Sequence, residues 1–159
     1  MNKSIAAICS LLEKTAWHFG NHGISEKCCG DLSFTEYIAL KIVYKNDQST
    51  IQFIGHALNF TKSGATKIIN RLEWKGYVIR KNSLRDGRFC CVSITDKGIA
   101  VISRIIENQT IQLENRLKHL TPEKKEDIKI TLEILVNALQ EHKSLKPALE
   151  DDLKGECCC

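Results

Sequence analysis

The most reactive residues in this sequence are its eight cysteines, a large number for a chain of 159 residues. All of them except Cys9 stand next to another cysteine, in the groups Cys28-Cys29, Cys90-Cys91 and Cys157-Cys158-Cys159. Adjacent cysteines bridge each other only with strain, so a disulfide framework is not predicted. No CxxC pair has zinc-finger spacing, so the sequence gives no strong support for a structural zinc site.

Thiolates bind soft metal ions and are the form of cysteine that oxidants attack, so the contiguous groups predict a sensing role. His18 and His22 precede Cys28-Cys29 by short distances, and together they are a candidate site for a thiophilic metal or metalloid ion. No cofactor is certain. The terminal triplet could complete a trigonal thiolate site, form a redox switch or be an appended tag. Prenylation is disfavoured, because acidic residues rather than a polybasic stretch precede the triplet.

Cys9 and the pair Cys90-Cys91 give weaker indications of a chemical role. Cys9 lies on the apolar stripe of an N-terminal helix and is predicted to be a small core residue. Because adjacent strand residues face opposite sides, only one of Cys90 and Cys91 can be buried. A thiol enzyme would need a cysteine with a general base and a shaped pocket. The sequence shows no such set, so no enzyme is predicted.

A second group of residues could bind nucleic acid. Thr61 is predicted to cap a helix that runs to about Trp74, and short polar or cationic side chains lie opposite its apolar face. Such groups suit base edges and phosphates, although they would also suit a solvated face. The candidate DNA-reading set is Thr61, Lys62, Ser63, Thr66, Lys67 and Asn70. Arg85 and Arg88 flank a predicted hairpin turn, where a guanidinium can enter a narrow minor groove.

The segments around these residues have the pattern of a helix-turn-helix followed by a hairpin. Gly55 permits close helix contact and Asn59 suits a left-handed turn. The apolar side chains that would lock the two helices are Ile54, Leu58, Phe60, Ala65 and Ile68. Gly76 is predicted to end the second helix. Strands at about 77–81 and 89–94 follow, joined through an Asp-Gly turn.

Further helices are predicted on both sides of this region. Residues of about 3–20 have apolar side chains at helical spacing. Ser33 and Glu36 form a capping box for a helix that ends near Lys45. A helix from Thr95 to about Leu120 is followed by a last helix whose first residue is Pro122. Because that last helix is apolar around most of its circumference, it must be buried on most sides. A second copy of the chain is the simplest cover, which predicts a homodimer.

Composition limits the class of protein. Hydrophobic residues make up 43% and charged residues 26% of the chain, as in globular domains, and the net charge of +4 permits DNA binding without proving it. No apolar run approaches the roughly 18 residues that a membrane span needs. Residues 5–12 are interpreted as part of a helix rather than a signal peptide. The expected location is the cytoplasm, with no membrane partner and with reduced thiols.

Residues 32–102 resemble the MarR family of winged-helix regulators. Four stretches carry the resemblance: Thr61–Thr66, Leu72–Ile79, the wing Arg85-Asp86-Gly87-Arg88, and Ile94–Gly98. The flanking helices extend it to about residues 3–140. The resemblance implies a two-fold dimer with one DNA-reading lobe per subunit. It also implies that Arg88 enters the minor groove, that Asp86 braces the wing, and that the loop with Cys28-Cys29 borders an effector pocket and the dimer interface.

The expected fold is mainly α with a small β wing, a winged helix-turn-helix with N- and C-terminal dimerisation helices. The expected parts are residues 1–32, a dimerisation helix and cysteine-bearing loop; 33–98, the DNA-binding lobe; 99–144, dimerisation helices; and 145–159, a polar tail. The expected function is a repressor that binds a pseudo-palindromic double-stranded operator and is released when a thiophilic ion or oxidation acts on the cysteines. The alternatives are release by an aromatic or phenolic ligand with incidental cysteines and, more distantly, a thiol-dependent redox enzyme.

Overall fold

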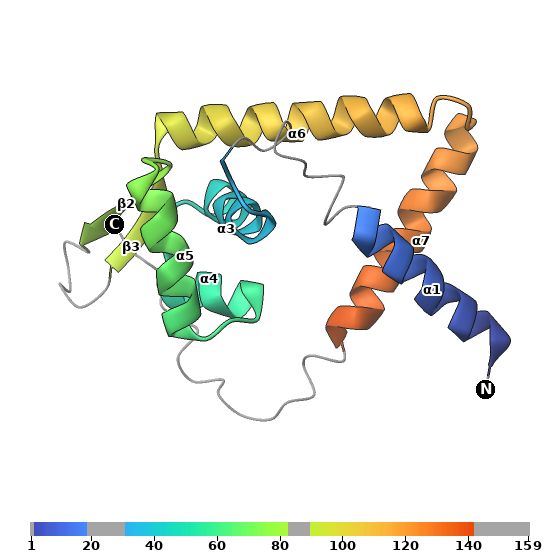
Figure 1. Ribbon diagram of the computed structural model, residues 1–159, viewed down its shortest axis with the longest axis horizontal. Coiled ribbons are helices and arrows are strands. Elements are labelled where there is room, and N and C mark those ends of the chain that lie inside the picture. The colour runs from blue at the N-terminus through green and yellow to red at the C-terminus, as the bar shows by residue number, and fades with distance from the viewer. Residues whose placement is uncertain (1, 19–30, 83–89, 142–159) are drawn as a thin grey trace. The chain divides into compact units, whose positions relative to one another are not determined.

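The computed structural model describes residues 2–18, 31–82 and 90–141. Figure 1 shows helices with a small sheet, which confirms the predicted mainly α fold with a β wing. The elements in chain order are α1 (Lys3–Trp17), α3 (Phe34–Lys45), β1 (Ser49–Thr50), α4 (Ile51–Leu58), α5 (Lys62–Trp74), β2 (Val78–Asn82), β3 (Cys90–Ile94), α6 (Asp96–Arg116) and α7 (Pro122–Glu141).

The chain forms two compact units, with a boundary between Gln109 and Thr110. The core lies in the first unit, where α3, α4, α5, the sheet and the first turns of α6 contribute fully buried side chains. Those with no exposed surface include Leu40, Val43, Ile54, Ile69, Leu72, Val78, Val92, Ile102 and Ile105.

Helix α3 begins as predicted. The Ser33 hydroxyl accepts from the Glu36 backbone N–H at 3.3 Å, and the Glu36 carboxylate accepts from the Ser33 backbone N–H at 2.8 Å. This reciprocal capping box satisfies two N–H groups that a helix N-terminus otherwise leaves unpaired. The helix ends at Lys45, and Asn46 caps it.

The turn between α4 and α5 confirms the predicted helix-turn-helix. Asn59 has the left-handed backbone conformation, with φ of 61°. A Cβ on Gly55 would lie 3.2 Å from the Cβ of Ala65, so a glycine is what allows α4 and α5 to approach so closely. Ile54, Ala65 and Ile68 are buried as predicted, whereas Phe60 is 46% exposed, so its assignment to the lock is wrong. Phe60 takes part in the turn through its backbone instead, where its N–H donates to the Gly55 carbonyl at 2.8 Å.

The sheet has three antiparallel strands in the order β1-β3-β2, one more than predicted. β2 and β3 pair from Val78 opposite Ile94 to Asn82 opposite Cys90. The additional strand, β1, consists of Ser49 and Thr50, which pair with Val92 and Cys91. The predicted Asp86-Gly87 turn between β2 and β3 lies outside the described residues.

A close backbone contact joins the sheet to α6. Gly76 ends α5 with φ of 75°, as predicted for a left-handed helix terminus. The Thr95 hydroxyl donates to the Gly76 carbonyl at 2.7 Å and accepts from the Gly98 N–H at 3.0 Å. A Cβ on Gly98 would collide with the Tyr77 carbonyl oxygen and lie 2.8 Å from Ile94, so only glycine fits there.

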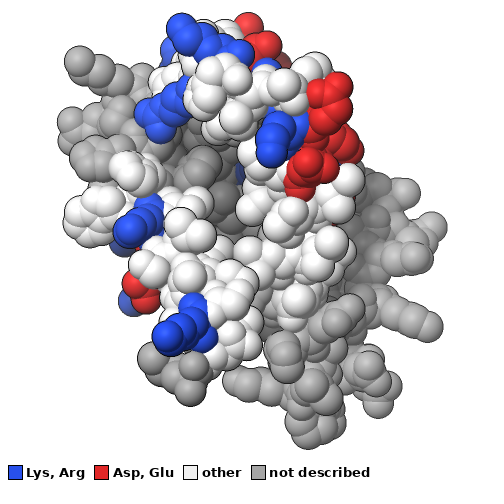
Figure 2. Space-filling view, turned by 90° about the vertical axis from the view of Figure 1, so that its right-hand side faces the viewer, with Lys and Arg blue, Asp and Glu red and all other residues white. Residues whose placement is uncertain are grey.

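The terminal helices expose many apolar side chains in the single chain. No residue of α1 is buried, so the prediction that Cys9 is a core residue is wrong for one chain. The exposed large apolar residues of α7 are Ile128, Ile130, Leu132, Ile134, Val136 and Leu139. On the face drawn in Figure 2, broad white areas without Lys, Arg, Asp or Glu lie among the charged side chains. Within the described parts of the chain, no helix is long and apolar enough to cross a membrane.

Candidate nucleic-acid interface

One face of α5 is polar and exposed. Lys62, Ser63, Lys67 and Asn70 are exposed on it and Thr66 is half-buried, while Ala65, Ile68, Ile69 and Leu72 are buried on the opposite face. The candidate set from 61 to 70 therefore shares one helix surface. Its cationic and amide groups can contact phosphates and base edges.

Two hydroxyls of this set are already used by the helix itself. The Thr61 hydroxyl accepts from the Gly64 backbone N–H at 3.2 Å, which caps α5 as predicted. The Thr66 hydroxyl donates to the Lys62 carbonyl at 2.8 Å. The Ser63 hydroxyl is 3.1 Å from the Thr61 hydroxyl and is still exposed to a further partner. The other exposed side chains of the set that can contact DNA are those of Lys62, Lys67 and Asn70.

Arg80 on β2 connects the wing to α5, a connection that the sequence analysis missed. Its Nη1 donates to Glu73 Oε2 at 2.6 Å, and its Nη2 donates to Asn70 Oδ1 at 2.5 Å. Glu73 and Asn70 lie one helical turn apart on α5, so one planar guanidinium can serve both. The available signal was the strand alternation, which places Arg80 on the same side of β2 as the buried Val78.

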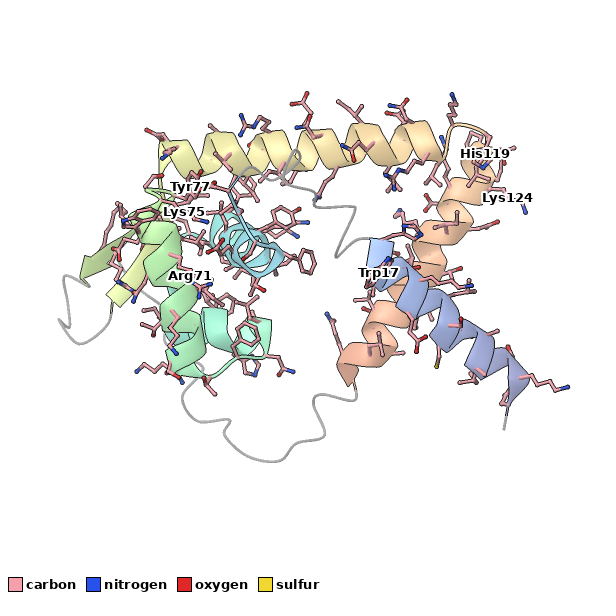
Figure 3. All side chains as sticks on the ribbon, in the orientation of Figure 1. Trp17, Arg71, Lys75, Tyr77, His119 and Lys124 are labelled. Carbon is pink, nitrogen blue, oxygen red and sulfur yellow. The ribbon has the colours of Figure 1, made fainter. Side chains whose placement is uncertain are left out.

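An open cavity of about 500 Å³ lies between the start of α3 and α5. It combines the aromatic ring of Phe60 and the side chain of Ile68 with two cations, Lys67 and Arg71. Figure 3 shows Arg71 on α5 in the same lobe. Such a lining can hold a small aromatic anion, and Arg71 is a second residue that the sequence analysis did not single out.

A partly buried ionic network lies at the other end of α5. Lys75 Nζ is 2.9 Å from Glu36 Oε2 and donates to the Asp31 carbonyl, and the Tyr77 hydroxyl donates to Asp31 Oδ1 at 2.8 Å. Figure 3 shows Lys75 and Tyr77 close together at the end of the helix. This network fixes the segment before α3 to the end of the DNA-reading helix.

The network shifts two pKa values. Burial alone would raise the pKa of Glu36, but the hydrogen bonds from Lys75 and Ser33 and the charge of Lys75 outweigh it, so the pKa is lowered. The pKa of Tyr77 is raised by burial, by the hydrogen bond to Asp31 and by the charge of Asp31, against a smaller opposing effect of Arg104. Glu36 is thus held ionised and Tyr77 neutral.

Of the candidate sensing groups, the described residues include only His18, Cys90 and Cys91. Cys91 is buried in β3, next to Cys90, and His18 caps the end of α1. Arg85, Arg88, His22, Cys28, Cys29 and the triplet Cys157, Cys158 and Cys159 lie outside the described residues. Among the residues that the structure does describe, no group of three or more His, Cys, Asp or Glu side chains could hold a metal ion.

A helix-turn-helix with an exposed polar second helix, followed directly by a β-hairpin, defines a winged-helix protein. Residues 24–105 match the family described as Transcriptional regulator SarA/Rot. The chain belongs to this family of winged-helix transcriptional regulators, and the MarR-type resemblance is confirmed.

Individual relatives agree with this assignment. The chain is similar to the HTH-type transcriptional regulator MhqR of Bacillus subtilis, with 26% identity over 129 residues that cover 79% of this chain and 81% of the relative. It is 22% identical over 99 residues to the organic hydroperoxide resistance transcriptional regulator of the same organism, which covers 62% of this chain and 64% of the relative. These relatives are transcription regulators and not enzymes.

Solved structures show the same fold. A MarR family protein from Bacillus stearothermophilus superimposes with a TM-score of 0.77 at 21% identity, covering 88% of this chain and 99% of that one. The S. aureus MepR–DNA complex superimposes with a TM-score of 0.64 at 18% identity, covering 81% of this chain and 94% of that chain.

Proposed function

We propose that this regulator is a homodimeric repressor that binds a pseudo-palindromic DNA operator, with α5 in the major groove and the wing in the minor groove. The observation that carries the proposal is the exposed face of α5, where Lys62, Ser63, Lys67 and Asn70 are available beside a rigid turn. In a two-fold dimer the two α5 helices would meet half-sites about one helical turn, roughly 10 bp, apart. Arg88 and Arg85 are the proposed wing contacts.

The dimer would be built from the terminal segments 1–32 and 99–144, with residues 33–98 as the DNA-binding lobe. Support comes from the apolar side chains that α1 and α7 expose in a single chain, such as Ile5 at 54% and Ile134 at 65%. Side chains of this size gain about 1.5–3 kcal/mol each when they are fully buried, so a partner surface is strongly favoured.

The proposed signal is a thiophilic ion or an oxidant that acts on cysteine. Support comes from the contiguous cysteines and from similarity to a regulator of organic hydroperoxide resistance. Cys28 and Cys29 are the first candidates because Asp31, two residues further on, is held by Lys75 at the end of α5 and by Tyr77. A change in that loop has a direct route to the DNA-reading helix.

A second candidate signal is a small aromatic anion with incidental cysteines. The cavity beside α5 favours it, because Arg71 and Lys67 provide cations next to the apolar surfaces of Ile68 and Phe60. A ligand there would lie against the DNA-reading helix and would compete with the operator.

The test of the proposed function is DNA binding by the full chain. In a gel shift with fragments of genomic DNA, we expect discrete complexes whose affinity falls steeply with salt. Footprints of those complexes should show two protected half-sites. Complexes that form equally with every fragment, or no complexes at all, would contradict an operator-binding role.

A further inference from the structure

The bridge from Arg80 fixes the orientation of the Asn70 side chain. A carboxamide has one acceptor oxygen and one donor NH2 group, whereas a guanidinium has only donors. The atom that faces Arg80 must therefore be Asn70 Oδ1, and the 2.5 Å contact agrees with this. If the amide were turned over, Asn70 Nδ2 would face the N–H groups of Arg80, and two donors cannot bond to each other. Asn70 Nδ2 is therefore the group that can bind another partner.

Glu73 stabilises the position of the Arg80 guanidinium and so the orientation of the Asn70 amide. It binds the same guanidinium through Nη1 at 2.6 Å, and the side chains of Arg80 and Glu73 are only 27% and 36% exposed. Arg80 is thus held between two residues of α5 in a charge-assisted fork, and its plane is set by the helix. Asn70 itself is exposed on the face that carries Lys67 and Ser63.

The base that Asn70 can read depends on this arrangement. Asparagine recognises adenine by accepting from N6 with Oδ1 while donating to N7 with Nδ2. Oδ1 has two lone pairs, of which Arg80 uses one, and the positive charge of the guanidinium opposes the partial positive charge of an adenine N6 amino group brought to the other. Guanine presents two acceptors, N7 and O6, in the major groove, which suit both the free Nδ2 donor and the positive charge nearby.

We propose that Arg80 is a specificity-determining positioning residue that makes Asn70 a donor and thereby selects guanine over adenine at one position of each operator half-site. This inference rests on the proposed function, because it requires α5 to lie in the major groove. Arg80 acts through Asn70 and needs no contact with DNA of its own.

The experiment is selection of bound sequences from random duplex DNA with the full-length protein, followed by sequencing. Loss of base preference in Asn70→Ala identifies the position that Asn70 reads. We expect guanine there for the wild type, and a shift towards adenine of about tenfold in the guanine-to-adenine ratio for Arg80→Ala, in which the amide is free to turn. Lys81→Ala, which removes a neighbouring exposed cation of β2, is the matched control and should keep guanine.

The remaining outcomes are distinguishable. Adenine at that position in the wild type, or guanine in both the wild type and Arg80→Ala, would overturn the inference and leave the proposed function intact. If neither Asn70→Ala nor Lys67→Ala alters any selected position, α5 does not read DNA and both proposals are overturned. If Arg80→Ala has a lowered melting temperature, Arg80→Met is used instead, because it keeps the aliphatic part of the side chain. The same shift from guanine towards adenine is expected for Arg80→Met.

Discussion

Lys67 is the cation nearest the middle of the exposed face of α5, between Ser63 and Asn70. If this face lies in the major groove, Lys67→Ala removes one phosphate contact. Operator affinity should fall by about tenfold at low salt, and the slope of log affinity against log salt should decrease by about one. Fluorescence anisotropy titrations at several salt concentrations measure both. Lys118→Ala, an exposed lysine outside the DNA-binding lobe, should change neither, and equal behaviour of the two variants would mean that α5 is misassigned.

Loss of Lys75 should destabilise the lobe, because Lys75 neutralises the buried Glu36. Removing one partner of a buried ion pair leaves an uncompensated charge, so Lys75→Met should destabilise the fold by on the order of 3 kcal/mol at pH 7. Denaturant unfolding measures this free energy. Lys75→Met combined with Glu36→Gln should recover part of the loss, and a double variant no more stable than the single one would show that the pair is not the cause.

The same pair predicts a pH dependence with a defined sign. The pKa of Glu36 is lower in the folded chain than its ordinary value of 4.5, so the folded state is stabilised above that value. This stabilisation is lost as the pH falls from about 4.5 through the lowered folded value. The wild type should therefore lose stability over this window relative to Glu36→Gln. Parallel acid unfolding curves for the two proteins would contradict the assignment.

At the scale of elements, the junction between the sheet and α6 tolerates no side chain at Gly98. The Cβ of Gly98→Ala would press into the Tyr77 carbonyl, and overpacking of this kind costs about 1–3 kcal/mol. We expect a lowered melting temperature and, because α6 starts here, weaker operator binding. Gly64→Ala, where a Cβ would meet its nearest atom at 3.4 Å, is the control and should retain the melting temperature. A Gly98→Ala protein as stable as the wild type would show that the junction can relax.

Elements with local signals could be predicted from the sequence, and elements fixed by distant contacts could not. Ser33, Thr61 and Gly76 mark helix ends through bonds within a few residues, and each does so in the structure. β1 is two residues long and has no periodicity, so only its pairing with β3 defines it. The helix predicted to run to about Leu120 ends at Arg116, and the Leu120 N–H bonds to the Leu117 carbonyl in a tighter turn beyond it.

The candidate site also has a part that could be predicted from the sequence and a part that could not. The polar face of α5 follows from helical spacing, so Lys62, Ser63, Lys67 and Asn70 could be found in the sequence. The Arg80 bridge joins residues seven and ten positions apart on different elements. Strand alternation places Arg80 on the inner side of β2, but it does not indicate which residues of α5 Arg80 contacts.

For the whole molecule, dimerisation can be tested at the most exposed large apolar side chain of the terminal helices α1 and α7. Ile134 is 65% exposed, so Ile134→Lys should leave the lobe folded while it places a charge in the proposed interface. We expect the dimer dissociation constant to rise by at least tenfold, as measured by sedimentation, with weaker operator binding. Gln52→Lys, on the exposed surface of α4, should remain dimeric. A wild-type chain that sediments as a stable monomer at micromolar concentration would refute the dimer itself.

The last prediction concerns how a signal releases the whole dimer from DNA. A ligand shifts such an equilibrium only by its difference in affinity for the two states. Moving from about 1% to about 99% released requires roughly 5.5 kcal/mol. Thiolate coordination is large enough to supply this, since structural zinc sites bind with about 10–16 kcal/mol. The proposed sensing thiols are Cys28 and Cys29, with the terminal triplet as accessory ligands. Cys90-Cys91 is the third candidate in this ranking.

The decisive variant is Cys28→Ser with Cys29→Ser, made with and without residues 157–159. Operator release is measured by gel shift against thiophilic ions, organic hydroperoxides and an aromatic carboxylate. We expect the ions and oxidants to release the wild type at lower concentrations than the double variant, because serine neither forms thiolate bonds nor is oxidised to a disulfide. Release by the aromatic carboxylate alone, lost in Arg71→Ala and retained in the serine variants, would instead place the signal in the cavity beside α5.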